Sequence, residues 1–355
     1  MKDQASELNW AAAACPVPLQ SYERIVLGHG SGGKLTAELI ANLFLPAFKN
    51  EHLARLDDQA VLPFDGTRLA FTTDSFIVTP LFFPGGDIGR LAINGTVNDL
   101  AMSGARPLYI AAAFILEEGL EMADLARVVD SMRAAALEAG VQLVTGDTKV
   151  VERGKGDKIF ITTTGLGAVE RPISISADRA CPGDKVLLSG YIGDHGMAIM
   201  SQRENLAFDG PIESDTAALH TLVADMLRAS EEIHCLRDPT RGGVATTLHE
   251  IAASSNVGVK IDEAKIPVRD SVQGACEILG LDPLYVANEG KLCAVVAGHA
   301  ADPILRQMRQ HPLGRDACLI GEVVAEHPRM VVMKTEIGGS RIVDVPFTEQ
   351  LPRIC

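Results

Sequence analysis

Residues 108–144, LYIAAAFILEEGLEMADLARVVDSMRAAALEAGVQLV, contain the pattern that decides the fold class. The stretch opens with an apolar run, Leu108 to Leu116, and closes with a shorter one, Val141 to Val144, and each run predicts a strand. Between the two runs, apolar residues recur at helical spacing until Gly140, at Met122, Leu125, Val128, Val129, Met132 and Leu137. Because a helix that joins two strands is typical of α/β folds, the sequence predicts an α/β protein.

The alternation of strands and helices continues on both sides of this stretch. Further strands are predicted at Arg68–Thr73, Lys158–Thr164, Lys185–Ser189, Val257–Ile261, Lys291–Ala297, Leu319–Val324 and Met330–Lys334. Further helices are predicted at Ile88–Ala101, Thr216–Ala229, Gly242–Ala253, Val268–Leu279 and Ala301–Gln310. The pattern starts again after Gly165-Leu166-Gly167, so we expect an N-terminal extension (1–20), an N-terminal domain (21–168), a C-terminal α/β domain (169–345) and a flexible tail (346–355).

Composition excludes several classes of protein. The 355 residues carry a formal charge of −14 and only 5% aromatic side chains, which argues against a nucleic-acid binder. Leu108 to Leu116 is the longest apolar run and is too short for a membrane span. The stretch from Trp10 to Leu19 lacks the basic start of a signal peptide. The seven cysteines (15, 181, 235, 276, 293, 318 and 355) form no CxxC pair, which favours a reducing cytoplasm over a disulfide framework or a zinc site.

A glycine-rich loop, Gly28 to Lys34, follows the apolar Ile25-Val26-Leu27 and precedes a helical pattern. Such loops let backbone N–H groups approach a phosphate, so we expect nucleotide binding by Gly30, Ser31, Gly32, Gly33 and Lys34. The loop nearly matches a P-loop, but Leu35 stands where a hydroxyl should bind Mg²⁺, and Thr36 points elsewhere. A flexible glycine linker is the alternative interpretation.

Four short acidic motifs are scattered through the first 150 residues. Their acids lie beside small or hydroxylic residues, at Asp57-Asp58, Thr73-Asp74, Asn98-Asp99 and Gly146-Asp147-Thr148. Asp74 and Asp147 each fall just past the end of a predicted strand, where ligand sites of α/β folds collect. Gathered carboxylates need a cation, so Asp58, Asp74, Asp99 and Asp147 are candidate ligands of a Mg²⁺ ion bound with a nucleotide.

A fifth motif, Asp238-Pro239-Thr240-Arg241-Gly242-Gly243, is either a helix cap or a further carboxylate of that site. The last residues, Pro352-Arg353-Ile354-Cys355, form the tip of an extended segment without periodicity. A cysteine at the tip of such a segment suits a carrier thiol. The other cysteines lie in patterned segments, so we expect them to be small packing residues.

Taken in order, the glycine loop, the five acidic motifs and the terminal Pro-Arg-Ile-Cys355 resemble the HypE family of hydrogenase maturation factors. That family belongs to the superfamily of aminoimidazole ribonucleotide synthetase, selenophosphate synthetase and thiamine monophosphate kinase, and the resemblance covers residues 22–355. It implies a two-domain PurM-like α/β fold with mixed sheets, and a homodimer whose N-terminal strands form a barrel beside bound ATP. It also places Asn98 and Asp238 among the nucleotide-binding residues.

The resemblance further implies an activity. Cys355 would receive a carbamoyl group from the carbamoyltransferase HypF, ATP-dependent dehydration would give a thiocyanate, and the cyano group would pass to iron on a HypC–HypD complex for [NiFe]-hydrogenase. Lys149 and Glu289 occupy the positions that match the catalytic base, and the sequence leaves open which of them acts. Two alternatives stay open, namely a small-molecule kinase or synthetase of the same superfamily and a nucleotide-binding scaffold without chemistry.

Overall fold

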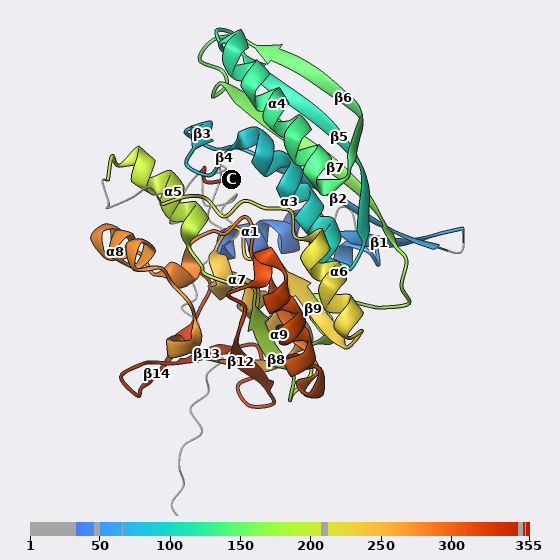
Figure 1. Ribbon diagram of the computed structural model, residues 1–355, viewed down its shortest axis with the longest axis vertical. Coiled ribbons are helices and arrows are strands. Elements are labelled where there is room, and N and C mark those ends of the chain that lie inside the picture. Colours follow the sequence, from blue (N-terminus) through green and yellow to red (C-terminus); the bar gives the residue numbers. More distant parts are fainter. Residues whose placement is uncertain (1–32, 46–49, 66, 207–211, 347–350, 352) are drawn as a thin grey trace, which may run out of the picture.

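The computed structural model describes residues 33–45, 50–65, 67–206, 212–346, 351 and 353–355. The predicted extension and the loop residues Gly30, Ser31 and Gly32 lie outside the described residues. Figure 1 shows two β-sheets, each packed against helices, with the first sheet and its helices at one end of the molecule. The prediction of an α/β fold with mixed sheets is confirmed.

The first sheet has the strand order β1-β2-β7-β5-β6. Its strands are β1 (Ala60–Phe64), β2 (Thr67–Phe76), β5 (Arg106–Glu117), β6 (Gln142–Val151) and β7 (Ile159–Val169). Only the β5–β6 pair is parallel, and helix α4 (Met122–Ala139) makes the crossover between them. The strand–helix–strand unit predicted from residues 108–144 is therefore confirmed, and Gly140 ends α4 in the left-handed conformation, with φ of 68°.

Helix α3 (Ile88–Met102) packs with α4 on one face of this sheet (Figure 1). The N-terminus of α3 is capped by Asp87, whose carboxylate accepts the N–H groups of Gly89 and Arg90. The helix lies close to β7 because Gly165 has no side chain: a Cβ atom there would lie 2.6 Å from Cγ2 of Thr96. This close approach brings the C-terminal half of α3 against β2 and β7.

The second sheet has the order β14-β13-β10-β12-β8-β11-β9. Its strands are β8 (Lys185–Leu188), β9 (Ile233–Arg237), β10 (Gly258–Asp262), β11 (Cys293–Val296), β12 (Cys318–Val324), β13 (Val331–Lys334) and β14 (Ser340–Val343). The other helices are α1 (Lys34–Leu39), α5 (Asp194–Arg203), α6 (His220–Ala229), α7 (Gly243–Ser255), α8 (Asp270–Leu279) and α9 (Ala301–Gln310), and a two-stranded hairpin joins β3 (Phe82–Phe83) to β4 (Gly86–Asp87).

The two sheets share a packed boundary. Ala101 and Met102 at the end of α3 belong to the same buried cluster as Leu222 and Met226 of α6. Since β9 also contacts α3, the residue that follows β9 lies next to the C-terminal half of α3. This boundary brings Asp238 beside residues of the first sheet. Among the described residues, no helix is long and apolar enough to cross a membrane.

Two strand ends differ from the prediction. Asp74 and Asp147 were expected just past strand ends, but Asp74 lies within β2 and Asp147 within β6. The cause is the uncovered face of the first sheet, where hydroxyl groups pair across strands: Thr73 with Thr164 at 3.0 Å, and Ser75 with Thr162 at 2.9 Å. Polar residues that suggested a loop therefore continue the strands.

Candidate active site

Four of the predicted carboxylates gather at the boundary between the two sheets. Asp58 precedes β1, Asp74 lies in β2, Asp99 lies in α3 and Asp238 follows β9. The Thr72 hydroxyl joins two of these segments, because it lies 2.7 Å from Oδ2 of Asp99 and 3.0 Å from the main-chain oxygen of Asp58. Each acid thus reaches the cluster from a different element.

Burial and mutual repulsion disfavour the charged forms of these acids. Burial, with the charge of Asp58 nearby, raises the pKa of Asp238 to about 8, and burial raises the pKa of Asp58 to about 6 despite Arg237. Burial also raises the pKa of Asp74, and burial with three neighbouring acids raises that of Asp99 well above its usual range. Asp58 has one ion pair, to Nη2 of Arg237 at 2.9 Å, and that arginine is shared with Glu250 at 2.7 Å. The cluster therefore has a deficit of positive charge.

The chemistry of this donor set suits Mg²⁺ bound together with a phosphate ligand. Carboxylate oxygens are the ligands that Mg²⁺ prefers, and in nucleotide sites it commonly takes one or two of them plus phosphate oxygens. Among the described residues, no three His, Cys, Asp or Glu side chains are close enough to hold an ion by themselves. The cluster therefore fits a cation completed by phosphates rather than an all-protein metal cage.

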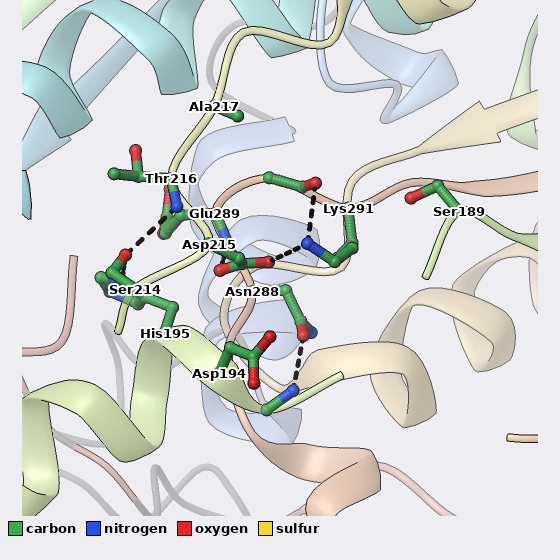
Figure 2. A network of polar contacts seen from close by, with 12 residues as sticks. Ser189, Asp194, His195, Ser214, Asp215, Thr216, Ala217, Asn288, Glu289 and Lys291 are labelled. Atoms are coloured by element: carbon green, nitrogen blue, oxygen red, sulfur yellow. Dashed lines mark hydrogen bonds and ion pairs between the residues drawn. The ribbon is translucent and has the colours of Figure 1, made fainter. Parts of the chain in front are cut away.

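Glu289 adds a fifth acid to this region, and it is more deeply buried than the four aspartates. Its residue is 3% exposed, its Oε1 atom has no hydrogen-bond partner, and its N–H donates to Oδ1 of Asp215 at 3.0 Å. Burial, with Asp238 and Asp74 nearby, raises the pKa of Glu289 well above its usual range. Its backbone is held close to Asp215, since a Cβ atom on Gly290 would lie 1.8 Å from the Asp215 carbonyl oxygen. Figure 2 shows the polar network around it.

Asn98 lies beside the cluster but is engaged in holding the two sheets together. Its Nδ2 donates to the Ala217 carbonyl at 3.0 Å, and its Oδ1 accepts the Leu219 N–H at 2.8 Å. The side chain thereby fixes the segment that leads into α6 against α3. Asn98 therefore holds α3 and the segment before α6 in their relative positions beside the site.

Asp147 and Lys149 lie away from the cluster, on the uncovered face of the first sheet. Nζ of Lys149 is 2.7 Å from Oδ2 of Asp147, and the two side chains are 70% and 61% exposed. The register pairs Asp147 with Ala113 of β5 and Lys149 with Ile115. Within one chain these residues therefore form a surface ion pair.

The described part of the glycine loop contacts the C-terminal region. Gly33 precedes α1, and Nζ of Lys34 forms an ion pair with Oδ2 of Asp344 at 2.8 Å. The Lys34 N–H also donates to the Pro346 carbonyl at 3.3 Å. Lys34 is thus bound to an acid outside the carboxylate cluster.

The last residues are docked on the protein, in contrast to the flexible tail expected from sequence. The Ile77 N–H donates to the main-chain oxygen of Cys355 at 3.1 Å, and the Thr79 N–H donates to the Arg353 carbonyl at 3.3 Å. Ile354 is 1% exposed and belongs to a core cluster that joins the first sheet to α5 and α8, and Cys355 is packed against the same cluster. Two backbone bonds and a buried side chain therefore fix the position of the thiol-bearing residue.

A buried polar network next to the tail was missed by the sequence analysis. His195 in α5 contacts the Ile354 carbonyl through Nε2 at 2.8 Å and Ser214 through Nδ1 at 2.7 Å. Next to Ser214, Asp215 forms an ion pair with Nζ of Lys291 at 3.1 Å. The available signal was a pair of polar residues, Asp194-His195, followed by apolar residues, and it is too weak to indicate a site by itself.

The described cysteines form no disulfide. Burial raises the pKa of the thiols of Cys235, Cys276 and Cys293 to about 12, and that of Cys318 to about 11. These four residues are packing residues, as expected. Cys181 differs from the expectation, because it is exposed, at the start of the turn that leads into β8.

Comparison with known proteins relates this geometry to two domain families. Residues 56–169 match the family described as "AIR synthase related protein, N-terminal domain", and residues 181–333 match "AIR synthase related protein, C-terminal domain". The carbamoyl dehydratase HypE of Azotobacter vinelandii is 59% identical over 327 residues, which span 92% of this chain and 96% of that protein.

Two solved structures are also similar. HypE in a HypE–HypF complex has a TM-score of 0.83 and 52% identity, covering 87% of this chain and 99% of the other. HypE in complex with ATP has a TM-score of 0.79 and 51% identity, covering 94% of this chain and 100% of the other.

Proposed function

This chain belongs to the carbamoyl dehydratase HypE family of hydrogenase maturation proteins, and we infer that its activity is the one of that family. It is an ATP-dependent carbamoyl dehydratase. We propose that the carbamoyl group is carried on Cys355 as a thiocarboxamide and is dehydrated there to a thiocyanate. The cyano group then leaves the Cys355 sulfur. The observation that carries this proposal is the docking of residues 353–355 against the network that contains Asp215 and Glu289.

The proposed reaction removes one oxygen and two protons from the carboxamide. The amide oxygen attacks the γ-phosphorus of ATP, so that an O–P bond forms and ADP leaves. The phosphorylated oxygen is then a good leaving group: the C–O bond breaks, inorganic phosphate departs, and the two N–H protons are lost as the C≡N bond forms. Phosphoryl transfer needs mainly positioning and charge neutralisation, so the site must hold the triphosphate firmly.

The carboxylate cluster is the proposed triphosphate site. We expect one or two of Asp58, Asp74, Asp99 and Asp238 to hold Mg²⁺ together with the nucleotide phosphates, and Gly30 to Lys34 to supply backbone N–H groups. Bound there, Mg²⁺ would offset the negative charge that otherwise builds up between nucleotide and protein. The raised pKa values of the carboxylates support this role, because their repulsion is relieved either by protonation or by a bound cation.

Glu289 is the proposed base. It is buried, its Oε1 atom has no hydrogen-bond partner, and burial raises its pKa, so the carboxylate accepts a proton readily once it is ionised. Lys149 is exposed and paired with Asp147, which does not favour it as the base within one subunit.

Replacing Asp99 with asparagine should have opposite effects on ligand-free stability and on nucleotide binding. The amide keeps an oxygen for the Thr72 hydroxyl and removes a carboxyl group whose pKa is raised on folding, a shift that destabilises the folded protein at neutral pH. We expect the free energy of unfolding of the ligand-free protein to rise by about 1 kcal/mol. Affinity for MgATP should fall at least about tenfold. Thermal unfolding and isothermal titration calorimetry measure the two quantities.

Asp130→Asn is the matched control, because Asp130 is an exposed acid of α4 that is 75% accessible. It should change neither quantity. An unchanged MgATP affinity in Asp99→Asn would remove Asp99 from the site.

We also propose a homodimer formed through the uncovered face of the first sheet. A row of apolar side chains crosses that face in register, from Phe71 in β2 through Leu166 in β7 to Tyr109 in β5, and Phe71 and Tyr109 are 45% and 44% exposed. Exposed apolar rows of this kind indicate a protein contact. Asp147 and Lys149 lie on the same face, so pairing of two chains would place these residues next to the neighbouring subunit. The predicted barrel would form when the first sheets of the two subunits pack against each other.

Tyr109→Asp should disrupt the dimer, because it would bury a carboxylate in the apolar contact. We expect the dimer dissociation constant to rise at least about 100-fold, as measured by sedimentation equilibrium. Ile337→Asp is the matched control, since Ile337 is 96% exposed in the second domain. A wild-type monomer, or a Tyr109→Asp dimer of normal strength, would exclude this interface.

The proposed partners follow the same chemistry. HypF would load the thiol and a HypC–HypD complex would accept the cyano group, in a cytoplasm whose reducing conditions keep the thiol free. Intact-mass spectrometry after incubation with HypF, carbamoyl phosphate and MgATP tests the function. Cys355 should gain the mass of a carbamoyl group and then lose one water, whereas an unmodified Cys355 would refute it.

A further inference from the structure

The docked tail has two sides, and each side is held by a different element. On one side, Ile77 and Thr79 donate backbone N–H groups to Cys355 and Arg353, which is the alternate spacing of a short antiparallel ladder. In such a ladder the carbonyl of the intervening residue, Ile354, points to the opposite side. There it meets Nε2 of His195 at 2.8 Å. Helix α5 thus supplies two side-chain donors to the tail, Nε2 of His195 to the Ile354 carbonyl and Nη2 of Arg203 to the Arg353 carbonyl.

The surroundings of His195 fix which nitrogen carries its proton. A carbonyl oxygen can only accept, so Nε2 must be the protonated nitrogen that donates to Ile354. His195 is 0% exposed, and burial lowers its pKa, which favours the neutral ring. Nδ1 is then an acceptor for the Ser214 hydroxyl at 2.7 Å, and Ser214 Oγ in turn accepts the Thr216 N–H at 3.2 Å. This chain of donors holds the tautomer that the tail requires (Figure 2).

The proposed chemistry does not otherwise use His195. Its ring meets the edge of Phe83, with centroids 5.6 Å apart and planes at 81°, which is an ordinary packing contact. An apolar side chain would fill that space as well, but it would leave the buried Ile354 carbonyl without its donor. The polar ring is therefore matched to its two hydrogen-bond partners, the Ile354 carbonyl and the Ser214 hydroxyl, rather than to its packing against Phe83.

We propose that His195 is a positioning residue that holds the tail in register for dehydration, by donating its Nε2–H to the Ile354 carbonyl. The inference rests on the proposed function, in which Cys355 is loaded by another enzyme. With Ile354 buried, a second active site cannot enclose the docked thiol, so the tail must leave for loading and return for dehydration. Weakening the His195 contact then slows dehydration and does not slow loading.

His195→Phe in the full-length protein tests this role. Incubation with HypF, carbamoyl phosphate and MgATP, followed by time-resolved intact-mass spectrometry, gives the rates of the two consecutive steps. We expect conversion of the carbamoylated form to the thiocyanate to slow about tenfold or more, with loading as fast as in wild type or faster. His195→Gln, whose side-chain N–H can reach the same carbonyl, should recover the dehydration rate to within about threefold.

A second measurement does not depend on catalysis. Amide hydrogen exchange of residues 77–79 should be faster in His195→Phe, because undocking of the tail exposes these N–H groups, and near wild type in His195→Gln. Phe83→Leu is the control, since it changes the packing of the ring but keeps its hydrogen bonds. It should lower the melting temperature and leave the ratio of the two rates unchanged.

Three outcomes separate the possibilities. Equal slowing of both steps in His195→Phe with unchanged exchange at residues 77–79 would assign His195 a purely structural role and overturn the proposal, as would an unchanged dehydration rate. Absence of thiocyanate in the wild-type protein would overturn the proposed function instead. In that case faster exchange in His195→Phe would still support the contact with the tail.

Discussion

Replacing Cys355 with alanine is expected to abolish formation of the thiocyanate while leaving MgATP affinity within about twofold of wild type. In the proposed function the thiol carries the carbamoyl group, whereas the proposed nucleotide site comes from β2, α3 and the segments before β1 and after β9. Intact-mass spectrometry with HypF, carbamoyl phosphate and MgATP should show no adduct on the variant.

Cys181→Ala is the matched control because Cys181 is an exposed cysteine that lies in the second domain. It should be modified as fast as the wild type. The same assay separates the alternative functions. A kinase or synthetase with a diffusible substrate would keep its ATP turnover in Cys355→Ala, and a scaffold would consume no ATP in either protein.

Glu289→Gln is expected to slow dehydration by about 10²- to 10⁴-fold, the usual contribution of a general base. Glutamine keeps the size of the side chain, and the backbone contact of residue 289 with Asp215 does not depend on it. Loading of Cys355 should continue, so that the carbamoylated form accumulates in the mass spectrum. This arrest between the two steps places the defect in dehydration rather than in loading.

Glu138→Gln controls for removal of a glutamate elsewhere, since Glu138 forms a surface ion pair with Arg90. It should leave both steps unchanged. Lys149→Met addresses the other candidate base. If the carbamoylated form accumulates in Lys149→Met while Glu289→Gln still makes thiocyanate, the base is the lysine and our assignment of Glu289 is wrong.

The fold could be predicted from sequence where the periodicity is local and strong. Helix α4 repeats apolar residues from Met122 onward and ends at a glycine, so both its position and its end were predictable. The strands around Asp74 and Asp147 were cut short in the prediction, because polar residues in a strand are read correctly only when one face of the sheet is known to be uncovered.

The site was predictable only where a motif marks it. Asp58, Asp74, Asp99 and Asp238 stand in short motifs, and the family that those motifs indicate is confirmed by the comparisons. His195 carries no motif: it becomes notable only because folding brings Ile354, from the far end of the chain, against α5. Such a contact depends on tertiary structure, which local pattern does not encode.

The burial of four thiols affects which cysteine of this protein a carbamoyl donor can modify. An enzyme that delivers an activated carbonyl group meets several cysteines in this protein, and thiolates are the species that react. With the pKa of Cys235, Cys276 and Cys293 near 12 and that of Cys318 near 11, those four are silent at neutral pH. Among the described cysteines, this leaves Cys181 and Cys355 as the thiols that can react with the carbamoyl donor. Burial of the other four thiols therefore reduces carbamoylation at the wrong cysteine.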